Sequence, residues 1–306
     1  MSFVAVLPPS RQRSGFVLIS MLILPNLLVL ADDQVIYPAA ESANDVRHDD
    51  KLELLTGALE RTRSDFGGYT LAPAPVVMNK ARQFASLERG MALTVIWSAT
   101  SQELEDRFLP VRIPLRKGLL GYKIALIPHD KQPFFDNVHS LEDLKKVVIG
   151  TGNGWVSTDV FKNAGLTVSV SNYESLFKLT ALGRIDMFPR GLNEVFAEYE
   201  ANKKELPTLA IEQRLVLYYP NAYYFFVGKT NTRLARRLEQ GLRTMIKDGS
   251  FDAIFWRYNG DAIREAKLHQ RRFIEIIDRS LPPATPLKEK NLWFDPTAPR
   301  PGNQNN

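Results

Sequence analysis

The chain has 306 residues, of which 44% are hydrophobic and 24% are charged, so it can build a sizeable core and is longer than most single lobes. Its formal net charge of +5 is too small, and its lysines and arginines too scattered, to indicate nucleic-acid binding. The chain has no cysteine, which excludes disulfides, cysteine nucleophiles and a thiol-linked lipid anchor.

The first 31 residues have the pattern of a secretory signal peptide. Arg11 and Arg13 precede an uncharged run, and Ala31 ends this run before two aspartates. The pattern predicts cleavage after Ala31 and export. An uncleaved membrane anchor is the alternative, because residues 14–31 approach the length of a membrane span, but Pro25 interrupts the run. Without a lipid anchor, the mature chain is expected in the periplasm of a bacterium with two membranes.

Apolar spacing predicts alternating strands and helices in the first third of the mature chain. Strands are expected at 35–38, 69–77 and 93–97, and helices at 49–66 and 80–87. Such alternation indicates an α/β lobe with a largely parallel sheet.

An extended apolar segment, Gly118–Ile127, leads into a second alternation, and Ser140 with Asp143 predicts a capped helix start. The further strands are expected at 147–150, 166–170, 185–188, 206–211, 215–219 and 223–227, and the helices at 158–164, 173–182, 232–248 and 251–258. Repeated prolines after residue 281 predict a strap or a disordered tail.

Three segments resemble parts of one family. They are SLEDLKKVVIGTGNGW, LFKLTALGRIDMF and, the most specific, LEQGLRTMIKDGSFDAIFWRYNG. In that order they resemble the entry into the second lobe, its next helix and strand, and the closing helices of type II periplasmic solute-binding proteins, in particular the polar amino-acid receptors. The resemblance covers about residues 35–268.

The resemblance implies an α/β fold of two lobes with the ligand in the cleft between them. Two crossing hinge strands are expected at 121–127 and 223–228. The expected divisions are a signal peptide at 1–31, lobe 1 at 32–122 and 226–280, lobe 2 at 123–225, and a proline-rich tail at 281–306.

The chain departs from the family at both ends of the amino-acid site. The receptors usually follow the third strand with Thr-x-x-Arg, but Glu103 stands in the place of the arginine, after Thr100. They usually carry an acid about five residues after the Gly-x-x-Asp aspartate, and Gly191, next to Arg190, stands there. The resemblance therefore does not extend to a standard α-amino-acid ligand.

Arg190 is the leading candidate for ligand contact. The strand predicted at 185–188 would deliver Pro189, Arg190 and Gly191 to the edge of the sheet where ligands bind in open α/β folds. A guanidinium there can bind a carboxylate or phosphate through two parallel hydrogen bonds. The alternative is an arginine that pairs with Glu194.

The loop from Gly150 to Thr158 follows a strand and opens a helix. Its free amides, with the hydroxyls of Ser157 and Thr158, are suited to an anionic group, and Trp155 to an apolar surface. The loop lacks the dinucleotide and P-loop patterns. The alternative is a capped turn with Trp155 packed beneath it.

In lobe 1, Tyr37 and Trp97 end two strands, where they would either stack on a ligand or fill the core. Ser98 and Thr100 follow the third strand, and Arg112 precedes the first crossing, where it is either a ligand contact or a solvated side chain.

Catalysis finds little support in the sequence. The histidines show no metal-ligand spacing, and no Gly-x-Ser-x-Gly elbow is present, so no enzyme activity, metal or cofactor is expected. We expect a monomeric periplasmic solute-binding protein that closes on a small polar, anionic ligand and delivers it to an inner-membrane permease. The alternatives are a sensory module for a signalling partner and a dehydratase-like enzyme on the same fold.

Overall fold

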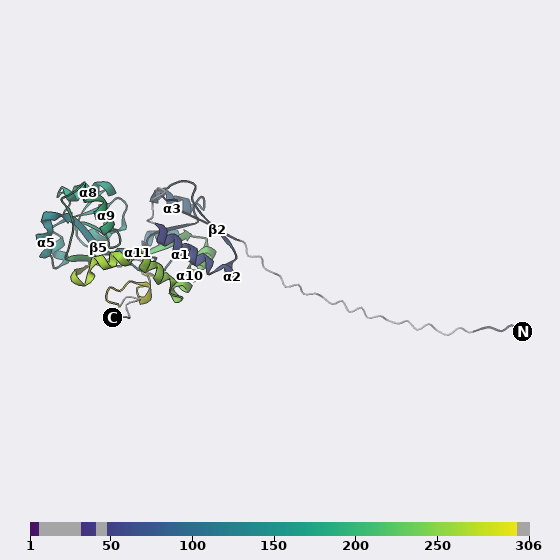
Figure 1. Ribbon diagram of the computed structural model, residues 1–306. Helices are drawn as coiled ribbons and strands as arrows, with labels where there is room; N and C mark the ends of the chain where they lie inside the picture. Colours follow the sequence, from purple (N-terminus) through teal and green to yellow (C-terminus); the bar gives the residue numbers. More distant parts are fainter. Residues whose placement is uncertain (6–31, 41–47, 299–306) are drawn as a thin grey trace.

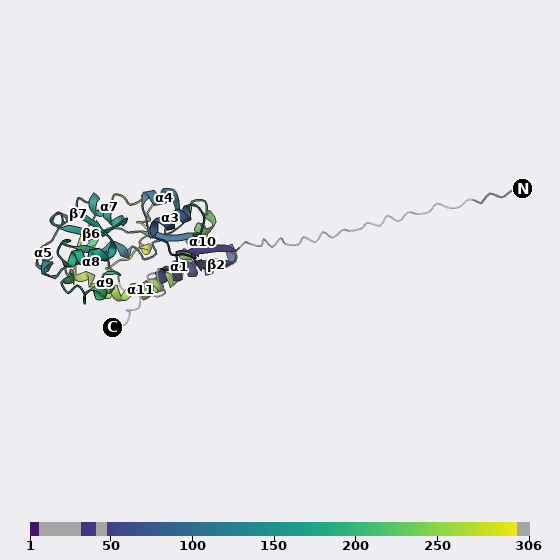
Figure 2. The same ribbon diagram turned by 90° about the horizontal axis from the view of Figure 1, so that it is seen from above.

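The computed structural model describes residues 1–5, 32–40 and 48–298. Most of the predicted signal peptide, with its charged start and its cleavage site, lies outside the described residues. No helix in the described part of the chain is both long and apolar enough to cross a membrane. Two α/β lobes lie side by side (Figures 1 and 2).

Lobe 1 contains the first four strands and a strand that returns late in the chain. Its elements are β1 (Asp33–Tyr37), α1 (Asp49–Glu60), α2 (Arg63–Phe66), β2 (Tyr69–Pro73), α3 (Lys80–Glu88), β3 (Val95–Ala99), α4 (Gln102–Arg107), β4 (Phe108–Val111), β11 (Tyr223–Gly228) and α10 (Thr232–Lys247). β1 pairs with β2 in parallel, whereas β11 lies between β3 and β4 and is antiparallel to both. The expectation of a largely parallel sheet was wrong for this lobe, because the returning strand enters its middle.

Lobe 2 is built around β5. Its elements are β5 (Tyr122–Pro128), α5 (Gln132–Asp136), α6 (Leu141–Leu144), β6 (Val148–Gly152), α7 (Val156–Asn163), β7 (Thr167–Ser171), α8 (Tyr173–Ala181), β8 (Phe188–Gly191), α9 (Val195–Asn202), β9 (Leu209–Ile211), β10 (Leu215–Tyr218) and β12 (Arg272–Glu275). The main sheet has the order β12-β10-β5-β8, and a parallel bridge between Ile149 and Met187 joins β6 to β8. The carboxyl ends of β6, β8 and β10 and the start of β5 therefore share one edge of the sheet.

The strand predicted at 185–188 begins three residues later than expected. Asp186 accepts a hydrogen bond from the backbone N–H of Val148, at 2.8 Å, and β8 pairs with β5 from Phe188 to Gly191. Arg190 is thus part of the strand itself, opposite Ile124, and does not follow it in a loop.

The two expected connections between the lobes are present. The chain leaves the core of lobe 1 at Leu115 and enters that of lobe 2 at Leu119, and it returns between Tyr219 and Ala222. The crossings fall just before the two predicted hinge strands. Backbone hydrogen bonds hold them together, from Leu115 N–H to Tyr223 (2.9 Å) and from Tyr219 N–H to Gly121 (3.3 Å).

A third connection is the helix α11 (Ser250–Ala266), which the sequence predicted to end near residue 258. Ile254 packs into the core of lobe 1, whereas Phe255 and Ile263 pack into that of lobe 2, so the helix extends along one side of both lobes (Figure 1). The chain then adds β12 beside β10. Residues 272–275, expected in lobe 1, therefore belong to the sheet of lobe 2.

The fourth connection is the C-terminal strap, residues 276–298. Ile276 packs in lobe 2, Leu292 in lobe 1 and Phe294 in lobe 2 again. The indole of Trp293 covers Gly118, whose missing Cβ would lie 2.5 Å from the ring and whose φ is +70°. The proline-rich tail is thus a docked strap as far as residue 298.

Candidate functional site

Two cavities lie between the lobes, and Trp155 lines both. The α11 cavity, of about 680 Å³, is lined by Asp50 and Arg116 from the lobe 1 side, by Tyr258 and Asn259 of α11, and by Trp155, Tyr173, Arg190, Asn193, Glu194, Ala197 and Glu198 of lobe 2. The strap cavity, of about 740 Å³, has walls from α4, α7 and the C-terminal strap. In Figure 2, α4 and α7 lie at the same side of the molecule, one on each lobe.

Arg190 lines the α11 cavity, but its guanidinium is already engaged. Its Nε lies 2.5 Å from Glu198, and one terminal nitrogen lies 3.0 Å from Glu194. The guanidinium also stacks 4.6 Å from the ring centre of Trp155. Burial disfavours the charge, yet the two carboxylates outweigh burial and raise the pKa of Arg190 above its usual value. The pairing with Glu194 that the sequence left open is present.

The lobe 1 wall of the α11 cavity carries a second buried ion pair. Arg116, in the first crossing, donates to both carboxylate oxygens of Asp50, at 2.5 and 2.9 Å. Burial opposes the charge of Asp50, but Arg116 and Lys51 lower its pKa below the usual range. Both walls of this cavity therefore present a carboxylate that an arginine already holds.

The position of Trp155 at the start of α7 depends on a glycine that leaves room for its ring. A Cβ on Gly152 would lie 2.3 Å from the indole, so only glycine admits this position of the ring. The indole is half-buried and stacks on Phe188 at 6.2 Å. Trp155 therefore packs against lobe 2, as the alternative reading of the loop expected, and it also lines both cavities.

The strap cavity contains two more of the predicted residues, Ser98 and Thr158. The hydroxyl of Thr158 donates to that of Thr151, at 2.9 Å. Lys80 lines the same cavity and donates to the carbonyl of Trp97, at 2.7 Å. Burial lowers the pKa of Lys80 to about 8.

The remaining lobe 1 candidates line neither cavity. Trp97 is 1% exposed and stacks with Tyr37 inside the lobe, at 6.3 Å between ring centres. Thr100 and Arg112 both bind Glu105, at 2.8 and 2.5 Å. The structure therefore places Tyr37 and Trp97 with the core, and Thr100 and Arg112 in a local network on a buried acid.

A polar cluster that the sequence did not single out lies at the cleft-facing edge of the lobe 2 sheet. We call it the unpaired cluster, and it consists of Lys123, Asn193, Tyr219 and Asn221. In the described part of the chain, Lys123 Nζ forms no hydrogen bond or ion pair. The Oδ1 atoms of Asn193 and Asn221 and the hydroxyl of Tyr219 are buried without a partner of acceptable geometry.

These four side chains are neighbours in space. Lys123 Nζ lies 5.9 Å from the ring centre of Tyr219. The residue Lys123 stands opposite Gly191 in the β5–β8 pairing, and Asn193 Oδ1 lies 3.2 Å from where a Cβ of Gly191 would be. Burial raises the pKa of Tyr219. Asn221 and Ser157 lie close enough to the phenol to oppose part of this rise. Of the four, Asn193 lines the α11 cavity, whereas Lys123, Tyr219 and Asn221 line neither cavity.

Lys123 is 8% exposed, and the charged groups that act on it electrostatically are Glu194, Arg190 and Glu198. Burial lowers its pKa to about 8, although Glu194 opposes the shift. Its ammonium is thus mostly charged at neutral pH. One signal for this residue exists in the sequence, because Lys123 is the only charge in the apolar run 118–128.

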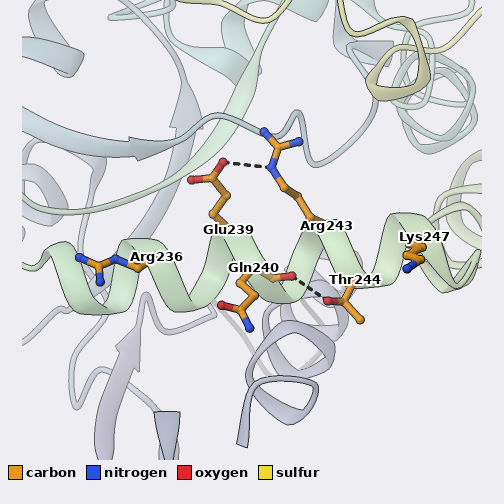
Figure 3. A pocket seen from close by; sticks show the side chains of 6 residues that line it. All are labelled: Arg236, Glu239, Gln240, Arg243, Thr244 and Lys247. Carbon is orange, nitrogen blue, oxygen red and sulfur yellow. Dashed lines mark hydrogen bonds and ion pairs between the residues drawn. The ribbon is translucent and has the colours of Figure 1, made fainter. Parts of the chain in front are cut away.

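A third hollow, of about 410 Å³, lies over the exposed face of α10 (Figure 3). Its lining residues are Arg236, Glu239, Gln240, Arg243, Thr244 and Lys247, all exposed and all from one helix. Arg243 pairs with Glu239 at 3.1 Å. A solvated helix face of this kind is no candidate site.

Within residues 32–40 and 48–298, no group of three histidine or carboxylate side chains is arranged to hold a metal ion.

No protein-family model and no curated protein sequence matches this chain. Solved structures with a similar fold include an ancestral arginine-binding protein bound to glutamine, with a TM-score of 0.53 and 19% identity over 75% of this chain and 98% of that one. A probable amino-acid ABC transporter extracellular-binding protein from Bacillus subtilis has a TM-score of 0.55 and 16% identity, over 76% and 99% of the two chains.

A histidine kinase sensor domain with similarity to periplasmic binding proteins has a TM-score of 0.52 and 15% identity, over 76% of this chain and 97% of that one. At these identities the likeness establishes the fold. The chain has the two-lobe α/β fold of type II solute-binding proteins.

Proposed function

We propose that this protein is a periplasmic solute-binding protein that closes its lobes on a small polar, anionic ligand and presents it to a membrane transporter. The observation that carries this proposal is that side chains from both lobes line the same cavity, so that one bound molecule contacts both. Contacts that form only when the lobes approach favour the closed state by their differential affinity. The fold and the expected export of the chain agree with this role.

We propose binding rather than catalysis, because the acids on the α11 cavity wall are held by arginines. Asp50 pairs with Arg116, and Glu194 pairs with Arg190, which lowers the pKa of Glu194 to about 2 despite its burial. A carboxylate with such a low pKa is a poor general acid or base at neutral pH.

The experiment is a thermal unfolding screen against amino acids, hydroxy and keto acids, dicarboxylates, phosphorylated metabolites and polyamines. A compound at about a hundred times its dissociation constant adds roughly 2.7 kcal/mol to the free energy of unfolding, which raises the midpoint by several degrees. We expect anionic compounds to give the largest shifts.

Two tryptophan substitutions on α9 provide a matched control. Ala197 and Ala201 are both exposed on this helix, but only Ala197 lines the α11 cavity. Ala197→Trp should abolish the shift, and Ala201→Trp should leave it unchanged. A screen in which no compound stabilises the wild type, or in which both variants respond equally, contradicts the proposal.

A sensory role on the same fold is the second candidate, since a sensor domain is among the similar structures. Co-purification of the ligand-bound protein with either a permease or a membrane kinase distinguishes the two roles.

A further inference from the structure

We infer that the unpaired cluster is the ligand's anchoring site, and that it selects an acid that carries hydroxyl groups and no ammonium group. This inference rests on the proposed function and specifies its ligand class. It assigns the contact with the anion to Lys123 and to its neighbours Asn193, Tyr219 and Asn221.

The first step concerns the positive charge. The guanidiniums on the α11 cavity wall, those of Arg116 and Arg190, are bound to carboxylates of the chain. Lys123, by contrast, is only 8% exposed and has no ion pair within the described residues. Burial of an unpaired ammonium group opposes folding. A bound anion would compensate this charge and offset the cost.

The second step concerns the neutral groups. Two amide oxygens and one phenol hydroxyl around Lys123 are buried and lack partners in residues 48–298. Buried polar atoms without partners cost free energy in the absence of a ligand, and such atoms near a buried ammonium group indicate a binding site. A ligand hydroxyl both donates and accepts, so it satisfies an amide in either orientation.

The third step excludes an ammonium group on the ligand. An ammonium bound in the cluster would lie beside Lys123 and be repelled by it. The carboxylates that face Lys123, Glu194 and Glu198, are already bound by Arg190, at 3.0 and 2.5 Å. The cluster therefore favours hydroxy acids over amino acids of the same size.

The test uses probes that differ in one group. Lactate, lactamide and alanine share a carbon skeleton, and so do gluconate and sorbitol. Dissociation constants are measured by isothermal titration calorimetry for the wild type, Lys123→Met and Tyr219→Phe. Lys204→Met is the control, because Lys204 is exposed in the same lobe.

We expect lactate and gluconate to bind the wild type at least ten times more tightly than alanine, lactamide or sorbitol. Lys123→Met should weaken gluconate binding by roughly 10- to 100-fold, as expected for the loss of a charge-assisted hydrogen bond, and Tyr219→Phe by a smaller factor. Lys204→Met should bind as the wild type does. Circular dichroism verifies that each variant is folded.

Equal binding of gluconate by the wild type and Lys123→Met overturns the inference, and so does tighter binding of alanine than of lactate. A protein that binds only amino acids or neutral compounds refutes this inference while the proposed function stands. A protein that binds none of the probes and none of the screened compounds refutes both.

Discussion

Lys123 places an ammonium group in the interior of the protein without a counter-ion from the described residues, and this arrangement opposes folding. Lys123→Met, which keeps the length of the side chain, should therefore raise the free energy of unfolding of the ligand-free protein by about 1–3 kcal/mol at pH 7. Urea denaturation measures the change. Lys204→Met should stay within about 0.5 kcal/mol of the wild type. A destabilised Lys123→Met variant would show that the ammonium is satisfied within the chain.

The same residue makes stability depend on pH. The pKa of Lys123 is about 8 in the folded chain and 10.5 for an ordinary lysine, so between these values the unfolded chain binds more protons. The destabilisation by Lys123 is full below pH 8 and declines as the pH rises toward 10.5, so the advantage of Lys123→Met should shrink over this range. Urea denaturation at pH 7, 9 and 10 tests the trend.

The groups that face Lys123 do not obscure this trend. Pairing with Arg190 lowers the pKa of Glu194 to about 2, and the pKa of Arg190 is raised above its usual value, so neither group titrates in this range. Burial raises the pKa of Tyr219 above its usual value. Lys51 and Lys80 also have a pKa of about 8, but they titrate in both proteins and cancel in the difference. A difference in stability that stays constant from pH 7 to 10 would contradict the account.

Arg190 holds two carboxylates and supports Trp155, so its loss should be costly whether or not a ligand is bound. Arg190→Met leaves the half-buried Glu194 and Glu198 without their partner, and the free energy of unfolding should fall by about 3 kcal/mol. Adding Glu198→Gln should recover part of the loss, because one uncompensated charge disappears. Guanidinium denaturation of the two variants tests the coupling. Equal losses in both would show that the unpaired charge of Glu198 is not what destabilises Arg190→Met.

At the scale of elements, the periodicity of apolar residues predicted most helices and strands. Their exact bounds depend on strand pairing and on tertiary packing, which the periodicity does not contain. Residues 185–188, three of which are apolar, look like a strand, but the pairing with β5 begins only at Phe188. The spacing of α11 identified its first two turns, whereas the second half became helical because Ile263 and Ala266 pack against lobe 2. The start of β5 was predicted from the sequence. That Lys123 has no partner in the described part of the chain was not, because this depends on residues that are distant in the sequence.

The turn into α7 depends on Gly152. Gly152→Ala would place a methyl group 2.3 Å from the indole of Trp155, so the ring must move out of its stack with Phe188. We expect a loss of stability of about 1–3 kcal/mol, a red shift of tryptophan emission and weaker ligand binding. An unchanged emission spectrum would show that the loop adapts without moving the ring.

At the scale of the whole molecule, four segments of the described chain join the lobes. The resemblance predicted two crossings, and the core membership of α11 and of the strap adds two more. The family pattern gave no signal for the strap, because its anchors, Leu292, Trp293 and Phe294, lie beyond the segments that carry the resemblance.

The strap should contribute to the stability of both lobes. Trp293→Ala removes a ring that covers Gly118 and packs against the cores of lobe 1. We expect the free energy of unfolding to fall by about 2 kcal/mol and the cleft to open more widely. Urea denaturation and small-angle X-ray scattering test the two effects. A variant with the stability and the radius of gyration of the wild type would show that the strap is only peripheral.

The central claim is that the lobes close on an anion bound at the unpaired cluster. The chain has no cysteine, so two spin labels can be placed freely, at Arg89→Cys in lobe 1 and Lys162→Cys in lobe 2, both exposed. The one measurement is the distance between these labels by pulsed electron paramagnetic resonance, with and without saturating gluconate. The account predicts a shorter and narrower distance distribution with the anion, and no change when Lys123→Met is added. An identical distribution with and without the anion in the labelled protein would contradict it.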